Sequence, residues 1–148
     1  MKKYFLGFIA ITFILCSFTL LKPTQNEVLN DNTQEIIFRK ISLDEAIKLA
    51  KKENKKIFLY AYTDWCQPCK MMQSTTYKDA EVAKYFNSHF INMQVEVEKD
   101  ANGPDIARRF NVRAHPCLLF VNSDGTLNTT ILGYYKGKDL LAKVKEIK

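Results

Sequence analysis

Residues 57–70 read IFLYAYTDWCQPCK, and this stretch decides the fold. Its first part, 57–62, is a short apolar run rich in aromatic residues, with the length of a buried strand. Cys66 and Cys69 follow at once, and their spacing brings two sulfurs within disulfide reach in the first turn of a helix. Pro68 is tolerated in that turn because its missing N–H would be unpaired there in any case. We therefore predict a strand, a cysteine pair and a helix in direct succession.

The cysteine pair predicts thiol chemistry. A cysteine at a helix N-terminus meets free N–H groups and the positive end of the helix dipole, which stabilise its thiolate. The thiolate is the attacking species in disulfide exchange, so Cys66 is the candidate nucleophile. Cys69, one turn further in, is more shielded and is the candidate resolving thiol. A structural disulfide would not need this placement, and a zinc site would need a second ligand pair, but the sequence has no other C-x-x-C and no paired histidines. The pattern favours a redox-active dithiol.

Length, composition and charge set the class of protein. A chain of 148 residues suits one domain, and 47% apolar with 26% charged residues is typical of a folded globular chain. The net charge of +6 comes from 22 basic and 16 acidic side chains that are interspersed along most of the chain, so we expect no nucleic-acid partner. The four cysteines are too few for a disulfide scaffold.

The N-terminal region predicts export. Lys2 and Lys3 precede an uncharged, mostly apolar run over 4–21, the layout of a signal peptide or an N-terminal membrane anchor. The positive-inside rule leaves the two lysines in the cytoplasm and places the rest outside. Cys16 offers a lipidation site, but Leu15 stands where a small residue usually precedes a lipidated cysteine, so we favour an apolar role for Cys16.

Three regions follow from this pattern. We predict a signal peptide or membrane anchor over 1–21, a polar linker over 22–35 and a folded domain over 36–148. The domain is expected in the periplasm or at the extracytoplasmic face of the cytoplasmic membrane, anchored or secreted through the N-terminal segment.

The remaining local signals give the order of elements. Ser42 and Glu45 form a capping box for a helix that should stop near Asn54, and Asp79 can cap another helix. The other predicted elements are a strand over 90–97, a helix over 104–110, strands over 117–121 and 129–132 around a turn at 122–125, and a helix over 139–147. Such β/α alternation followed by a hairpin and a helix indicates an α/β fold, with a central mixed β-sheet and helices on both faces.

Two segments resemble a known family. Residues 65–70, WCQPCK, resemble the active-site segment of thioredoxin-fold proteins, in which W-C-x-P-C-K is typical. Residues 112–120, VRAHPCLLF, resemble the stretch of that family in which a cis-proline precedes an apolar strand. The resemblance covers 36–148 and implies a thioredoxin-like three-layer fold. The sequence of residues 76–82 resembles that of one subgroup of the family, which includes the C-terminal domain of membrane thiol:disulfide interchange transporters.

The resemblance implies a thiol–disulfide oxidoreductase that reduces disulfides in client proteins. The sequence has no signal for a nucleotide, flavin or heme, so we expect no cofactor. Such a reductant outside the cytoplasm needs a membrane electron donor. Pro116 would hold the backbone of His115 beside Cys66, where an extended client segment can pair with it. The implied catalytic residues are Cys66 and Cys69, and the implied supporting or substrate-binding residues are Trp65, Pro68, His115 and Pro116.

One departure from the family pattern concerns the proton route. Six residues before Cys66, thioredoxins commonly carry a buried Asp that assists proton transfer at the second cysteine, but this chain has Tyr60. Water, Glu96 or Glu98 are candidate substitutes for that carboxylate at Cys69.

A second departure concerns Cys117, which follows the proline where Thr is usual. It is either a small buried apolar residue or a third thiol close to the pair. The alternative function is therefore a soft-metal-binding thioredoxin-like protein that uses Cys66, Cys69, Cys117 and His115. A redox-inert interaction module is a third possibility, which the intact pair disfavours.

Overall fold

The computed structural model describes residues 34–147. Its elements, in chain order, are α1 (Leu43–Glu53), β1 (Lys56–Tyr62), α2 (Gln67–Ser74), the 3-10 helix η1 (Thr76–Lys78), α3 (Ala80–His89), β2 (Phe90–Glu96), α4 (Gly103–Arg109), β3 (Cys117–Val121), β4 (Leu127–Leu132) and α5 (Gly137–Lys145). The predicted signal or anchor over 1–21, with Cys16, and most of the linker lie outside the described residues. Among the described helices, none has both the length and the apolar character needed to cross a bilayer.

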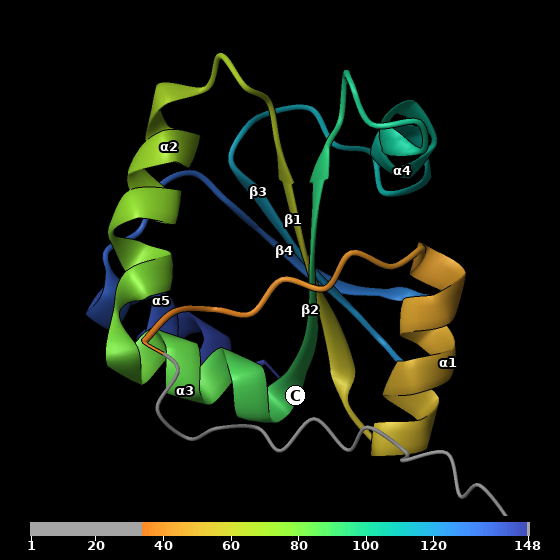
Figure 1. Cartoon of the computed structure of the whole chain (residues 1–148), viewed down its shortest axis with the longest axis horizontal. Coiled ribbons are helices and arrows are strands. Elements are labelled where there is room, and N and C mark those ends of the chain that lie inside the picture. Colours follow the sequence, from red (N-terminus) through yellow and green to blue (C-terminus); the bar gives the residue numbers. More distant parts are fainter. Residues whose placement is uncertain (1–33, 148) are drawn as a thin grey trace, which may run out of the picture.

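The four strands form one mixed sheet in the order β2-β1-β3-β4. β1 runs parallel to β2 and antiparallel to β3, and β3 runs antiparallel to β4. Figure 1 shows α2, α3 and α5 on one side of the sheet and α1 and α4 on the other. The predicted three-layer α/β fold is confirmed.

The central strand is buried on both faces. Phe58 and Tyr60 of β1 face the α2/α3/α5 side, whereas Ile57, Leu59 and Ala61 face the α1/α4 side. Side chains alternate between the two faces of a strand, so a strand covered on both faces is a continuous apolar run. This is why residues 57–62 show no polar alternation in the sequence.

The predicted helix caps are present. The Ser42 hydroxyl accepts a hydrogen bond from the Glu45 N–H at 3.2 Å, and the Glu45 carboxylate accepts one from the Ser42 N–H at 2.8 Å. Helix α1 ends at Asn54, whose φ of 52° is left-handed. The Asp79 carboxylate accepts hydrogen bonds from the first N–H groups of α3.

Element boundaries differ slightly from the predictions. β4 begins at Leu127 rather than Thr129, because the turn closes early with a 2.8 Å hydrogen bond from the Asn122 N–H to the Thr126 carbonyl. α5 begins at Gly137 rather than Asp139 and ends at Lys145. The turn η1 between α2 and α3 was not predicted.

Candidate active site

The cysteine pair lies at the junction between β1 and α2 and forms a disulfide. Cys66 and Cys69 are bonded to each other, with 5.2 Å between their Cα atoms. Cys66 is the N-cap of α2, and its sulfur accepts a hydrogen bond from the Cys69 N–H at 3.2 Å. Pro68 lies in the first turn of the helix, as predicted. The backbone of this turn thus directs an N–H group at the sulfur that would carry the thiolate.

The sulfurs are sheltered, but the residue before them is not. Cys66 and Cys69 expose only 3% and 1% of their surfaces, so Cys69 is the more buried by a small margin. Trp65, by contrast, is 65% exposed. Aromatic rings held open to solvent provide large contact areas at low entropic cost. The indole ring is therefore a large exposed apolar surface next to Cys66 in the chain.

The loop that carries Trp65 is tied to the end of β2. The buried Glu96 carboxylate accepts hydrogen bonds from the N–H groups of Asp64 at 3.2 Å, Glu98 at 3.0 Å and Lys99. The Trp65 indole N–H donates to the Glu98 carboxylate at 3.0 Å, and the Lys99 ammonium pairs with the Asp64 carboxylate at 2.6 Å. These hydrogen bonds go to the loop, so a proton route to Cys69 through either glutamate stays a prediction.

Tyr60 lies behind the redox helix. Its hydroxyl donates a hydrogen bond to the Cys69 carbonyl at 3.2 Å, and its side chain is completely buried. Burial raises the pKa of the Tyr60 hydroxyl far above its usual range. Where thioredoxin-fold proteins commonly place a carboxylate, this chain therefore has a group that stays neutral and donates.

The loop before β3 completes the site. The His115–Pro116 peptide bond is cis, as the resemblance implied. The His115 ring lies edge-on to the Trp65 ring, with 6.1 Å between centroids. The Pro116 carbonyl accepts a hydrogen bond from the Gly133 N–H at 2.9 Å, which ties this loop to the end of β4. The structure thus brings two of the predicted supporting residues, Trp65 and His115, together from segments that are far apart in the sequence.

A family model for the thioredoxin-like domain matches residues 43–148, most of the chain. The chain belongs to the thioredoxin-like domain family. Among solved structures, a candidate disulphide-isomerase from Bacteroides thetaiotaomicron is 40% identical, with a TM-score of 0.67 and coverage of 75% of this chain and 91% of that one. The C-terminal domain of Neisseria meningitidis DsbD in its oxidised form shares the fold, with 22% identity, a TM-score of 0.61 and coverage of 76% and 99%.

The curated relatives are much longer proteins. Thiol:disulfide interchange protein DsbD of Colwellia psychrerythraea is 26% identical over 138 residues, which cover 88% of this chain and 22% of the relative. The Haemophilus ducreyi protein of the same name is 30% identical over 98 residues, covering 64% and 17%. This thioredoxin-like chain spans about a fifth of the length of these relatives. The family and the Cys66–Cys69 pair together support thiol–disulfide oxidoreductase activity.

The third cysteine of the thioredoxin-like domain is separated from the pair. Cys117 is a buried free thiol that packs with Leu119 on the α1/α4 side of the sheet, whereas Cys66 and Cys69 lie on the α2/α3/α5 side. Burial raises the pKa of the Cys117 thiol to about 11. Of the two interpretations of Cys117, the structure therefore supports the small buried residue and not a third thiol close to the pair.

The soft-metal alternative therefore loses its ligand set. Within residues 34–147, no group of three or more His, Cys, Asp or Glu side chains is arranged to hold a metal ion. The prediction that Cys117 could join the pair and His115 was wrong, because β3 directs its first side chain to the opposite face of the sheet.

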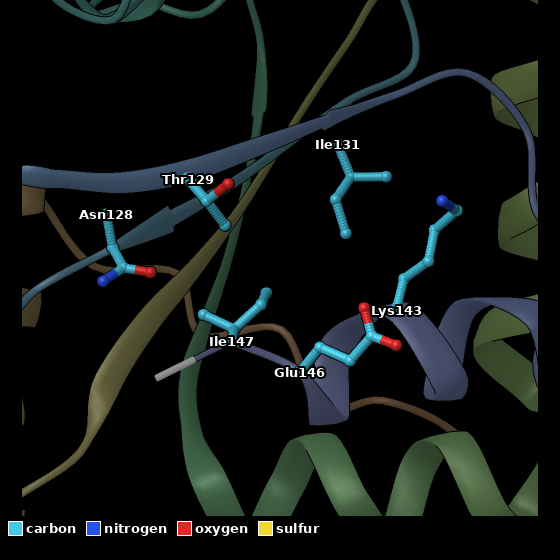
Figure 2. A pocket seen from close by; sticks show the side chains of 6 residues that line it. All are labelled: Asn128, Thr129, Ile131, Lys143, Glu146 and Ile147. Atoms are coloured by element: carbon cyan, nitrogen blue, oxygen red, sulfur yellow. The ribbon is translucent and has the colours of Figure 1, made fainter.

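A hollow of the thioredoxin-like domain lies away from the predicted site residues. This hollow, of about 500 Å³, is lined by residues of β4 and of the C-terminal end of the chain around α5, whose side chains Figure 2 shows: Asn128, Thr129, Ile131, Lys143, Glu146 and Ile147. None of these is a predicted site residue.

Proposed function

We propose that this protein is a membrane-tethered, extracytoplasmic thiol–disulfide oxidoreductase that reduces disulfides of client proteins. The observation that carries the proposal is the Cys66–Cys69 disulfide at the start of α2 in a thioredoxin-like domain. In this proposal residues 1–21 are the signal or anchor, 22–35 the linker and 36–148 the catalytic domain. Similarity to DsbD, a thiol:disulfide interchange protein by name, supports the same class of reaction.

The reaction begins from the reduced pair. The Cys66 thiolate attacks one sulfur of a client disulfide, the client S–S bond breaks, and the departing client thiolate takes up a proton. The Cys69 thiol then loses its proton and attacks the Cys66 sulfur, which frees the second client thiol. The client gains two electrons and two protons, and the domain ends as the disulfide seen in the structure.

The supporting residues are proposed to receive the client. Trp65 offers an exposed ring beside the disulfide, and the His115 ring lies edge-on to it. The backbone of His115, fixed by Pro116, would pair with an extended client segment. Pro68 holds the first turn of α2 without needing a hydrogen-bond donor.

A catalytic reductant must itself be reduced again after each turnover. Each turnover leaves the domain disulfide, which needs two electrons and two protons before the next client. We propose that a membrane protein carrying a dithiol supplies them, since glutathione and NADPH-linked reductases belong to the cytoplasm.

The reduction potential of the full-length chain in detergent tests this function. Trp65 is the single tryptophan of the chain and adjoins Cys66, so its fluorescence reports the state of the pair in defined dithiol/disulfide buffers. A midpoint near that of thioredoxin, about −270 mV, supports a reductase. A midpoint near −120 mV would reverse the direction to disulfide formation, and one near −180 mV would favour isomerisation. Absence of a reversible two-electron transition would overturn the proposal.

Cysteine variants provide the matched controls. Cys66→Ser should abolish exchange, and Cys69→Ser should accumulate a mixed disulfide with a peptide substrate because the resolving thiol is missing. Cys117→Ser, on the other face of the sheet, should retain the wild-type rate of exchange. Loss of exchange in Cys117→Ser alone would contradict the assignment of the dithiol.

A further inference from the structure

Tyr60 connects the centre of the sheet to the redox helix. It lies in the middle of β1, is completely buried, and donates its hydroxyl hydrogen bond to the Cys69 carbonyl at 3.2 Å. The bond joins a side chain of the strand to the backbone of the first turn of α2. A rigid sheet thereby holds a turn that would otherwise depend on local backbone bonds.

The peptide group that accepts the Tyr60 hydrogen bond is itself bonded to the backbone of Cys66. The carbonyl of Cys69 and the N–H of Lys70 belong to one peptide group, and that N–H donates to the Cys66 carbonyl at 3.2 Å. In the same turn the Cys69 N–H donates to the Cys66 sulfur at 3.2 Å. Hydrogen bonds in series polarise one another, so a donor at the Cys69 carbonyl strengthens the Lys70 donor and fixes the turn.

The surroundings of Tyr60 keep its hydroxyl a donor. The Tyr62 ring stacks on the Tyr60 ring with 5.3 Å between centroids, and the ring centroids of Tyr77 and Phe38 lie 5.0 and 6.2 Å from that of Tyr60. Removal of the hydroxyl from water penalises the phenolate, which raises its pKa. At neutral pH Tyr60 cannot act as a base, so it influences the dithiol only by position and dipole.

We propose that Tyr60 is a positioning residue for the reaction, which holds the first turn of α2 so that the Cys69 N–H stabilises the Cys66 thiolate. The inference rests on the proposed function and adds to it a residue outside the cysteine motif. A thiolate gains more from this N–H than a disulfide sulfur does, because hydrogen bonds to charged acceptors are the stronger ones. Tyr60 therefore stabilises the reduced state relative to the disulfide.

The test compares two tyrosine-to-phenylalanine variants of the full-length chain. Tyr60→Phe removes the hydroxyl that holds Cys69. Tyr77→Phe removes a buried hydroxyl that has no hydrogen-bond partner among the described residues, so it is a matched control for the loss of one oxygen from the same aromatic cluster. The charged and titratable groups of the adjoining loops are identical in both variants, namely Asp64, Glu96, Glu98, Lys70, Lys99 and His115.

Two measurements are made on each variant. The first is the equilibrium of the domain disulfide and two glutathione molecules with the domain dithiol and glutathione disulfide. The second is the pH dependence of Cys66 alkylation by iodoacetamide. For Tyr60→Phe we expect the dithiol-to-disulfide ratio to fall about 2–10-fold, which corresponds to the net free energy of one hydrogen bond. We also expect the pH at which Cys66 becomes alkylated to rise. For Tyr77→Phe both should stay within about twofold of wild type.

The outcomes separate this inference from the proposed function. Equal values for Tyr60→Phe and wild type, or equal shifts in both variants, would overturn the role of Tyr60 while wild-type exchange upholds the oxidoreductase. Absence of exchange in the wild type would overturn the function itself. If Tyr60→Phe does not fold, nuclear magnetic resonance of the wild-type protein still tests the inference. The Tyr60 hydroxyl proton should exchange slowly with water and show a nuclear Overhauser contact to Cys69. Absence of that contact overturns the inference.

Discussion

Glu96 offers the sharpest test of how the site is held. The residue is 3% exposed, and its carboxylate accepts three backbone N–H bonds, from Asp64 on one oxygen and from Glu98 and Lys99 on the other. Glu96→Gln keeps the size and shape of the side chain but replaces one acceptor oxygen with an NH₂ donor. In either orientation, that donor faces an N–H group.

The magnitude follows from these contacts. In the better orientation the amide oxygen faces the Glu98 and Lys99 N–H groups, and the Asp64 N–H loses its acceptor. A hydrogen bond to a charged group contributes about 1.5–3 kcal/mol, against about 0.5–1.5 kcal/mol for a neutral one. Loss of one such bond and weakening of two others, offset by the easier burial of a neutral amide, should cost about 2–4 kcal/mol of unfolding free energy.

The assay is urea unfolding of the oxidised chain, followed by circular dichroism. Glu98→Gln is the control, because its carboxylate bonds to the indole N–H of the exposed Trp65 and should cost less than about 1 kcal/mol. Glu96→Gln within about 0.5 kcal/mol of wild type would refute the reasoning, as would equal losses in the two variants.

Two further predictions use features outside the cysteine motif. Gly103→Ala would place a Cβ atom 2.5 Å from the Glu96 carbonyl oxygen and 2.9 Å from backbone atoms of Val97, so it should lower the unfolding free energy by about 1–3 kcal/mol in the same urea assay. Cys117 is an acid whose pKa rises from 9.0 to about 11 on folding, so the folded state holds its proton longer than the unfolded state does. The stability it contributes is complete below pH 9 and falls as the pH rises toward 11, a fall that should be smaller in Cys117→Val when unfolding is measured across that range.

The local elements were predictable because their signals are local. The Ser42–Glu45 capping box, the Asp79 cap and the strand–cysteine–helix succession all depend on residues within one or two turns of each other, and the structure contains each of them. The small errors fall at boundaries. β4 and α5 begin earlier than predicted, since the hydrogen bonds that fix the turn and the end of a helix depend on neighbours in space.

The contacts around the dithiol were less predictable. Tyr60 stands out in the sequence only as a departure from the family pattern, and its bond to the Cys69 carbonyl depends on how α2 packs over β1. Glu96 was predicted only as a candidate for proton transfer, which stays a prediction, and the sequence did not indicate that its carboxylate accepts the N–H groups of Asp64 and Glu98. No sequence spacing indicates which backbone N–H groups will gather around a buried carboxylate.

By itself, the sequence determined the redox pair, the order of the strands and α-helices, and the family, because each follows from short-range spacing and two motifs in a fixed order. Only the tertiary structure decided which face of the sheet each cysteine occupies. Cys117 adjoins the cis-proline in the chain yet lies across the sheet from Cys66 and Cys69. The reason is geometric: alternation along β3 fixes Cys117 relative to Leu119, but the side on which α2 packs is set by the strand connections and the burial of both faces.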